Sequence, residues 1–294
     1  MRTISISAIL VLLTLLLVAC TSDYEVENEP QLVVEGWIDN EGYPVVMLTT
    51  TVSVTEERQQ LSDLVNYILK WAKVTVSDGE QEVVLTGKVD RQYFPPYIYT
   101  TSRIQGKTGK SYRLTVDYEQ FHAEATTTIP ESSELDSIRV RPCELTDTLY
   151  EIQAYFHDDM QEPRYYKFFT LTGTNSRLFL SSYMQTLSNQ VFATNQEQCV
   201  SVYKGRLVTA PSSYIPYFTA SDSVVVKFAR IDYESFLFWN EMERNATLGG
   251  SPITSVHTNP SFNVKGALGY WCGYGASLYP VSIGDSIRAA AWKH

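Results

Sequence analysis

Cys20 has the most chemically specific surroundings of any residue in this sequence. Its thiol, which is a nucleophile once deprotonated, directly follows a run at residues 4–18 that is almost entirely apolar, and Arg2 is the only charged residue before it. The run is shorter than the roughly 20 residues of a membrane-spanning helix, and no second apolar run of that length occurs downstream. We therefore predict that residues 1–19 are a signal peptide and that the chain is exported.

The four residues Leu17-Val18-Ala19-Cys20 resemble the lipobox of bacterial lipoproteins, in which the cysteine sulfur receives a diacylglyceryl group. The alternative is an ordinary signal peptide with a fortuitous cysteine. Three features favour lipidation: the position of Cys20, the small residues before it and the polar residues after it. A diacyl group plus an amide-linked acyl chain, with palmitate among the fatty acids, exceeds the two signals that stable anchoring needs. We predict that Cys20 is the lipidation site and that the mature protein stays bound to a membrane.

Residues 20–30 are rich in acidic side chains and contain no basic one. Such a segment has too little apolar surface to fold, and like charges keep it extended, which predicts a lipidated acidic tether. An acidic run at this place also resembles the signal that sends Bacteroidota lipoproteins to the outer face of the outer membrane. A merely solvated linker is the alternative. Outer-membrane attachment is therefore our expectation, and display toward the cell exterior is a further hypothesis.

Catalytic and metal-binding motifs are absent from the sequence. It contains no G-x-S-x-G, H-E-x-x-H, P-loop or G-x-G-x-x-G motif, and its histidines, His122, His157, His257 and His294, are scattered singly with no C-x-x-C nearby. We therefore predict no catalytic residue, no metal and no cofactor, and that the protein is not an enzyme. A glycan or peptide hydrolase with two carboxylates paired in space, among 33 acidic residues, is the poorer alternative.

Adjacent aspartates occur at Asp158 and Asp159, between two β-rich runs. Such a pair could bind calcium or take part in catalysis, but aspartates in a turn more often cap backbone amides, and capping is our interpretation. The remaining cysteines after lipidation are Cys143, Cys199 and Cys272. In an oxidising compartment one pair could form a disulfide, and the sequence does not choose among the three pairings.

The charge balance excludes nucleic acid as a partner. The formal net charge is -10, it becomes more negative by one when Arg2 is removed with the signal peptide, and Lys and Arg do not cluster.

Strand patterns dominate the mature chain, in keeping with 20 Tyr, 12 Phe and 5 Trp. We predict seven short strands within residues 31–130, at 32–38, 44–52, 73–77, 82–86, 97–104, 111–118 and 121–129. This density of strands and turns predicts an immunoglobulin-like β-sandwich. Apolar residues at helical spacing predict a short amphipathic helix at 61–69, inserted between two strands.

A boundary at 130–134 separates this sandwich from a second β-rich domain over residues 134–294 with one or two helices. We expect strands at 135–141, 150–156, 164–171 and 224–231, the middle two forming a hairpin. Asp232 is expected to cap a helix that reaches about residue 246, with its aromatic stripe in the core. The less regular stretch at 175–217 is the expected region of partner contact.

Seven short segments in order resemble the domain of unknown function family 4249 of Bacteroidota lipoproteins. They are LVVEGWI at 32–38, KVTVSDG at 73–79, GKTGKSYRLTV at 106–116, TTIP at 127–130, LDSI at 135–138, YYKF at 165–168 and GALGYWCGY at 266–274. The resemblance implies a lipoprotein encoded beside a TonB-dependent outer-membrane transporter, and so a non-catalytic accessory role in the capture or uptake of a nutrient whose identity is unknown. A structural or adhesive surface module is the alternative. The resemblance supplies no catalytic residues.

Overall fold

The computed structural model describes residues 30–51, 65–144, 146–158, 161–173, 177–192, 196–205, 214–248 and 261–291. The predicted signal peptide, Cys20, and all of the tether except its last residue lie outside the described residues, as do Asp159, His257 and His294. The first described strand begins at Leu32.

The described part of the chain forms three β-sheets. The longest has the strand order β12 (Leu180–Ser188), β11 (Tyr165–Thr172), β15 (Ser223–Ile231), β17 (Leu268–Ser282), β1 (Leu32–Asp39), β2 (Val45–Thr50), β6 (Tyr97–Thr100), β5 (Thr86–Val89). The second has the order β16 (Val264–Lys265), β8 (Phe121–Thr128), β7 (Ser111–Tyr118), β3 (Lys73–Ser77), β4 (Glu82–Val84). The third has the order β13 (Gln198–Val202), β10 (Thr146–Phe156), β14 (Phe218–Thr219), with β9 (Ser137–Cys143) also paired to β10.

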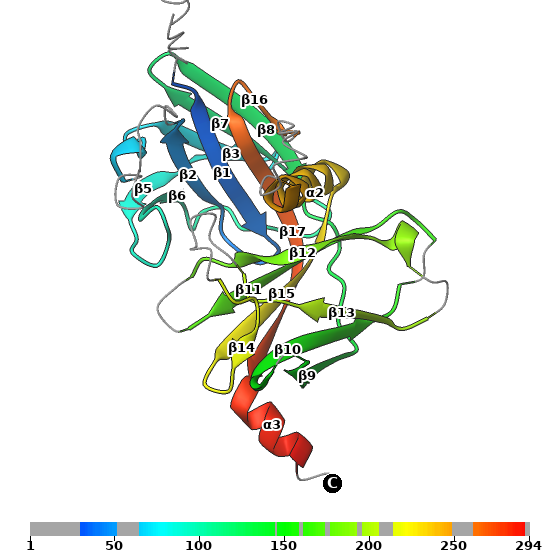
Figure 1. The fold of residues 1–294 in the computed structure, drawn as a ribbon. Helices are drawn as coiled ribbons and strands as arrows, with labels where there is room; N and C mark the ends of the chain where they lie inside the picture. Colours follow the sequence, from blue (N-terminus) through cyan, green and yellow to red (C-terminus); the bar gives the residue numbers. More distant parts are fainter. Residues whose placement is uncertain are drawn as a thin grey trace, which may run out of the picture.

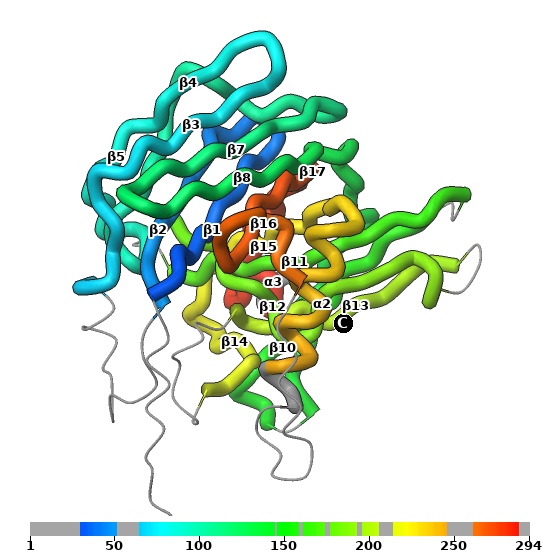
Figure 2. The backbone as a smooth tube through the Cα atoms, turned by 90° about the horizontal axis from the view of Figure 1, so that it is seen from above, coloured from blue at the N-terminus to red at the C-terminus, as the bar shows by residue number. Residues whose placement is uncertain are grey.

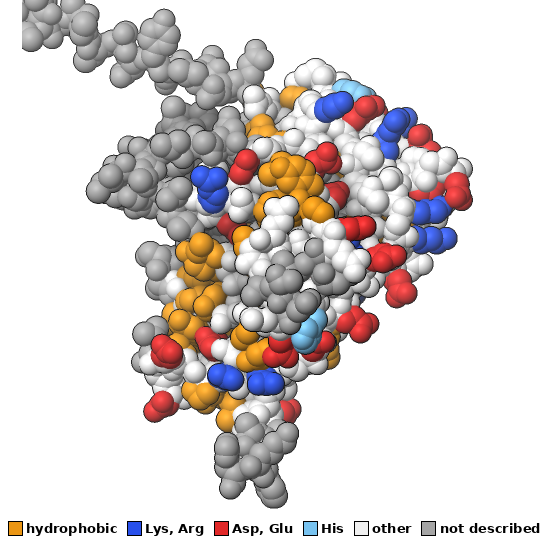
Figure 3. Space-filling view, turned by 90° about the vertical axis from the view of Figure 1, so that its right-hand side faces the viewer, with side chains coloured by type: hydrophobic (Ala, Val, Ile, Leu, Met, Phe, Trp, Pro, Cys, Tyr) orange, Lys and Arg blue, Asp and Glu red, His pale blue; other side chains and the backbone are white. Residues whose placement is uncertain are grey.

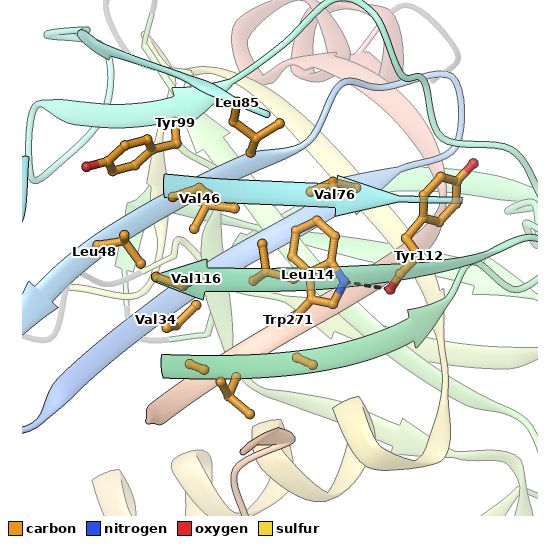
Figure 4. Packing of buried hydrophobic residues seen from close by; sticks show 14 of the residues in the cluster. Val34, Val46, Leu48, Val76, Leu85, Tyr99, Tyr112, Leu114, Val116 and Trp271 are labelled. Carbon is orange, nitrogen blue, oxygen red and sulfur yellow. Dashed lines mark hydrogen bonds between the residues drawn. The ribbon is translucent and has the colours of Figure 1, made fainter. Parts of the chain in front are cut away.

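The first core lies between the second sheet and the β1 half of the longest sheet, and Figure 2 shows β3, β7 and β8 layered across β1 and β2. Alternate residues of β1 are buried, as a strand with one core-facing side requires. Figure 4 shows Trp271 of β17 at the centre of this core among valine and leucine side chains. Trp271 is 0% exposed, so the closing GALGYWCGY segment is a packed strand.

Two glycines let β17 approach β1. A Cβ atom on Gly36 would lie 2.8 Å from Cε3 of Trp271, so only glycine leaves room for the indole ring. Gly269 has a φ of +109°, and a Cβ there would lie 1.9 Å from the carbonyl oxygen of Val34. Both glycines thus permit the parallel pairing of β1 with β17.

The strand β17 extends through both halves of the molecule, as Figure 1 shows. Its first part pairs with β1 in parallel, and its second part pairs with β15 antiparallel. It contributes Trp271 to the first core and Val281 to a second core. The strands on either side of the predicted boundary at 130–134 therefore share one continuous sheet.

The second core lies between the third sheet and the β15 half of the longest sheet, and its largest side chains are aromatic. Phe228 packs between Phe168 and Phe156, with ring centroids 4.7 and 5.0 Å away. The prediction that 150–156 and 164–171 form a hairpin is wrong, because β10 pairs with β9, β13 and β14 while β11 pairs with β12 and β15. The two strands lie in different sheets on opposite sides of this core.

The described residues include the helices α2 (Tyr233–Leu248) and α3 (Ile283–Ala291) and the short 3-10 helix η2 (Asn189–Val191). The predicted cap is confirmed, because Oδ1 of Asp232 accepts a hydrogen bond from the amide of Ser235 at 2.8 Å. The aromatic stripe of α2 packs on the longest sheet, where Trp239 contacts Phe169 and Phe238 contacts Tyr270. No helix among these described residues has the length and apolar character needed to cross a bilayer.

The all-β prediction with one or two helices is confirmed, while some element boundaries differ. Strand β5 and the regular strands β12 and β13 were not predicted. The predicted helix at 61–69 lies partly outside the described residues. Its described part is a 3-10 turn at 65–67, after which Ile68 forms a β-bridge with Thr49.

Candidate functional site

The two described histidines, His122 and His157, do not belong to a metal site. The Nδ1 atom of His122 lies 2.7 Å from a carboxylate oxygen of Asp117, and that of His157 lies 2.7 Å from one of Asp136. Both histidines are exposed, and they lie apart, His122 on β8 of the second sheet and His157 directly after β10 of the third. No group of three or more His, Cys, Asp or Glu side chains in the described ranges is arranged to hold a metal ion.

Asp158 is a buried structural carboxylate. It accepts hydrogen bonds from the hydroxyl of Tyr166 at 2.5 Å, Nδ2 of Asn189 at 3.3 Å and a guanidinium nitrogen of Arg164 at 3.4 Å. Burial and then the bond to Asp158 raise the pKa of Tyr166 to about 12. These three donors to Asp158 are side chains, and the capping of backbone amides by the aspartate pair stays a prediction.

The described cysteines, Cys143, Cys199 and Cys272, are all free thiols. Cys143 and Cys272 are buried and Cys199 is exposed. Burial raises the pKa of Cys272 to about 12, which makes its thiol a poor nucleophile.

Lys167 on β11 is a fully buried charged side chain next to α2. Its Nζ donates to the carboxylate of Glu243 on α2 and, at 3.2 Å, to the carbonyl oxygen of Ser182 on β12. The same ammonium group lies 5.5 Å from the ring of Trp239 and 5.7 Å from that of Phe169. Burial lowers the pKa of Lys167, and the Glu243 carboxylate opposes that shift.

Glu243 also closes an irregularity in the sheet. The register between β11 and β12 shifts between Lys167 and Phe169, and at this bulge Glu243 accepts hydrogen bonds from the amides of Gln185 at 3.1 Å and Thr186 at 3.2 Å. The ion pair therefore fixes α2 against an edge strand. A desolvated lysine can serve as a nucleophile elsewhere, but this one is enclosed, and its role is structural.

A second buried lysine joins the two halves of the longest sheet. Nζ of Lys227 on β15 donates to Oδ1 of Asp39, the last residue of β1, at 2.5 Å and lies 4.4 Å from the ring of Tyr274. Beside it, Oδ1 of Asn40 accepts a hydrogen bond from the amide of Ala276 at 2.6 Å. The end of β1 is thus held to β15 and β17 by a charged and a polar contact.

A pocket of about 390 Å³, which we call the junction pocket, opens where the β2, β5 and β6 strands meet the segment that precedes β12. It is lined by Tyr43, Val45, Lys88, Asp90, Tyr93, Ile98, Thr100, Thr101, Ser102 and Arg177. Buried Val45 and Ile98 make an apolar part of the lining, whereas Tyr43 is 48% exposed. Nζ of Lys88 lies 3.7 Å from a carboxylate oxygen of Asp90, so charges of both signs face the pocket.

Tyr93 is held in place on one wall of the junction pocket. Its amide donates to the carbonyl oxygen of Asp90 at 3.2 Å, and its ring centroid lies 6.2 Å from that of Trp37. The amide of Arg177 donates to the carbonyl oxygen of Gln92 at 3.0 Å, which ties the far wall to the same loop. Burial and then the negative charge of Asp90 raise the pKa of Tyr93, so its hydroxyl is a neutral donor and acceptor near pH 7.

These groups suit the binding of a polar organic molecule. Tyrosine rings offer flat apolar faces, and charged and hydroxyl side chains offer oriented hydrogen bonds. A nucleophilic serine needs an adjacent base, and the described lining includes Ser102 but no histidine.

Two further hollows are less suited to such a ligand. One of about 480 Å³ lies between β8, α2 and residues 261–265 and is lined by several charged side chains and one aromatic ring, Phe262. One of about 370 Å³ lies between β9, β17 and α3 and is lined largely by small polar and aliphatic side chains. The junction pocket differs from both in having two tyrosines, because the larger hollow has none and the smaller one has Tyr279 alone.

On the face drawn in Figure 3, the described Lys and Arg side chains lie among Asp and Glu side chains and form no continuous basic area. Binding a polyphosphate chain needs such an area.

A family model described as a domain of unknown function, DUF4249, matches residues 20–277. The chain belongs to the DUF4249 family. The DUF4249 match includes every residue of the junction pocket and ends within β17, and it begins at Cys20, the residue predicted to be the first of the mature chain. No curated protein sequence matches the chain.

The junction pocket was not predicted from the sequence, apart from one residue. Arg177 falls within the stretch 175–217 that was expected to contact a partner. A signal for the rest was available in the run RQYFPPYIY at 91–99, where aromatic residues and prolines are concentrated. The predicted site residue, Cys20, lies outside the described residues.

Proposed function

We propose that this DUF4249 protein is a lipoprotein anchored in the outer membrane through Cys20, and that it assists a TonB-dependent transporter by capturing a nutrient at the cell exterior without catalysing a reaction. The lipobox-like residues before Cys20, the acidic residues after it and the start of the family match at Cys20 support the anchoring. The transporter partner rests on the resemblance described above.

The junction pocket carries the capture part of the proposal. Its volume of about 390 Å³ falls within the range of small-molecule sites in proteins. Its walls come from β2, β5 and β6 of the longest sheet and from loops beside them, and Lys227 and Asp39 hold the neighbouring strands together. A ligand with a ring or chain to lie against Tyr43 and Tyr93, and hydroxyl or charged groups to meet Lys88, Asp90 and Arg177, fits this lining. Oligosaccharides and short peptides have this chemistry.

Co-purification tests the transporter partnership. The tagged full-length protein is extracted from native cells with a mild detergent, and a β-barrel transporter is expected among the proteins that remain bound. Cys20→Ala is the matched control, because loss of the anchor removes the protein from the membrane and should remove the transporter from the eluate. If wild-type protein brings down no transporter, the accessory role is wrong, and a structural or adhesive role takes its place.

Calorimetry on a panel of oligosaccharides and peptides tests capture. A bound member should bind at least about tenfold more weakly to Tyr93→Ala and Arg177→Ala, since each loses more than about 1.4 kcal/mol of contact. Tyr233→Ala is the control, because Tyr233 is 55% exposed and lies on α2 outside the pocket. Equal affinity of all three variants would place the ligand elsewhere, and turnover of any panel member would support the hydrolase alternative.

A further inference from the structure

Trp71 is the most exposed large apolar side chain among the described residues, at 88%. It has a φ of +73°, in the left-handed region that a bulky residue rarely adopts. A backbone conformation of this kind persists only where the surrounding structure imposes it, and such residues concentrate at functional positions. Packing in the hydrophobic core therefore explains neither the exposure of Trp71 nor its backbone conformation.

The backbone on both sides of Trp71 is held by one buried tyrosine, Tyr99. The hydroxyl of Tyr99 donates to the carbonyl oxygen of Leu69 at 2.9 Å and accepts from the amide of Ala72 at 3.0 Å. Tyr99 is 2% exposed, and burial raises its pKa to about 12, so both bonds persist across the physiological pH range. We call residues 69–72 the Trp71 loop. Tyr99 thus fixes the backbone from which the exposed indole of Trp71 projects.

The Trp71 loop lies at the end of the first sandwich, which is the pair of sheets around the first core. It is the end at which β1 begins. Ile68 bridges Thr49, next to Thr50, and Thr50 pairs with Leu32 at the start of β1. Lys73, directly after the loop, pairs with Asp117 near the end of β7. The indole is therefore displayed at the end of the molecule that carries the amino-terminal segment.

The chain length before β1 limits how far this end can lie from the anchor. Twelve positions separate Cys20 from Leu32, and a fully extended chain of that length spans at most about 40 Å. A lipid on Cys20 thus keeps the Trp71 loop within reach of the bilayer surface. Tryptophan is enriched at membrane–water interfaces because its ring is apolar and its N–H can meet headgroups or water.

We propose that the Trp71 loop docks into the headgroup layer of the bilayer that holds Cys20, with the indole of Trp71 at the interface and the ammonium of the neighbouring, exposed Lys70 near lipid phosphates. The net charge of the chain, -10, disfavours strongly anionic surfaces, so a zwitterionic phospholipid is the expected contact. The docking fixes the orientation of the body relative to the membrane. It rests on the anchoring proposed above and extends it to a second membrane contact.

Quenching by brominated lipid tests the docking. The mature chain, with Cys20→Ser and an amino-terminal histidine tag, is held on phosphatidylcholine vesicles through a nickel-chelating lipid, so the anchor does not depend on acylation. Brominated acyl chains should quench the wild-type tryptophan emission more than that of Trp71→Asn, because the other four tryptophans are common to both proteins. Asparagine tolerates the left-handed backbone, so this variant should keep its fold, and its circular dichroism is compared to verify that.

Leu278→Asn is the matched control, since Leu278 is 55% exposed on the second part of β17, and its quenching should equal that of the wild type. Equal quenching of wild type and Trp71→Asn would overturn the docking. So would protection of Trp71 that appears only with a co-purified transporter, which would assign the loop to a protein partner. Mass spectrometry of native Cys20 decides acylation separately, so failure of the anchor and failure of the docking are told apart.

Discussion

The indole Nε1 of Trp271 donates a hydrogen bond to the backbone carbonyl oxygen of Tyr112 at 2.9 Å, across the first core from β17 to β7 (Figure 4). The two residues lie 159 positions apart in the sequence. The bond satisfies the one polar atom of an otherwise apolar side chain that is fully buried. It also makes the last part of the chain a component of the core built by the first part.

Trp271→Phe should lower the free energy of unfolding by about 3 kcal/mol, since it leaves the Tyr112 carbonyl without this donor and opens a cavity. Urea unfolding followed by circular dichroism measures the change. Trp71→Phe serves as the control, because that side chain is 88% exposed and should change stability by less than about 0.5 kcal/mol. Equal effects of the two substitutions would contradict the assignment of Trp271 to the core.

Lys167→Met should lower the free energy of unfolding by about 3 kcal/mol, because it removes the buried cation that is paired with the largely buried Glu243 carboxylate. Adding Glu243→Gln should recover part of that loss, since an amide oxygen can still accept a hydrogen bond at the β12 bulge. A double-mutant cycle in urea measures the coupling. Strictly additive losses would show that the two side chains do not interact.

Local pattern was enough to locate most strands. The alternation at Tyr150, Ile152, Ala154 and Phe156 predicted β10, and the last three of these side chains are 0% exposed. The predicted strands at 73–77 and 82–86 correspond to β3 and β4, and in the turn between them Oδ1 of Asp78 accepts a hydrogen bond from the amide of Gln81 at 2.9 Å. These features depend on neighbours within a few residues, which a sequence displays directly.

Strand partners could not be obtained in the same way. Residues 166–170 of β11 are buried on both faces, which is the burial of a central strand and is compatible with several neighbours. The short connection to β10 favoured a hairpin, whereas β11 lies between β12 and β15. Strand β12 escaped prediction because its bulge, with Met184 at a φ of +51°, interrupts the period of two.

The candidate site required the tertiary structure. Tyr43, Tyr93 and Arg177 line one pocket, yet no local pattern in the sequence predicts that these three residues meet. They meet because β2 and β6 pair in the longest sheet and because Arg177 bonds to the loop at Gln92. Only Cys20, whose chemistry depends on its immediate neighbours, could be proposed as a site from the sequence.

Lys227→Met should lower the free energy of unfolding by about 2 kcal/mol, which is less than the loss expected for Lys167→Met. The reason is that the Asp39 side chain left behind is 28% exposed and can be hydrated, whereas Glu243 is 15% exposed. Differential scanning calorimetry of both variants gives the order. The exposed Lys107 supplies the control substitution, Lys107→Met, with a change of less than about 0.5 kcal/mol. If Lys227→Met destabilised the protein more than Lys167→Met, the ion pair between Lys227 and Asp39 would be stronger than the 28% exposure of Asp39 indicates.

His122 should titrate above its ordinary pKa of 6.5, because the hydrogen bond to Asp117 and then the charges of Asp117 and Glu124 favour the imidazolium. A histidine with a raised folded pKa stabilises the fold below the unfolded pKa, and this stabilisation is lost as the pH rises through the folded pKa. The window therefore starts near pH 6.5 and extends upward.

Proton NMR titration of the histidine ring resonances, assigned with His122→Gln, measures the shift. Asp117→Asn should return the pKa of His122 toward 6.5, whereas Glu124→Gln should change that pKa less. The reason is distance, because a carboxylate oxygen of Asp117 lies 2.7 Å from Nδ1 of His122 and one of Glu124 lies 3.6 Å from Nε2. The pH dependence of the unfolding free energy above pH 6.5 should weaken in Asp117→Asn for the same reason. A wild-type pKa at or below 6.5, or a larger response to Glu124→Gln, would show that the cross-strand pair does not hold the proton on His122.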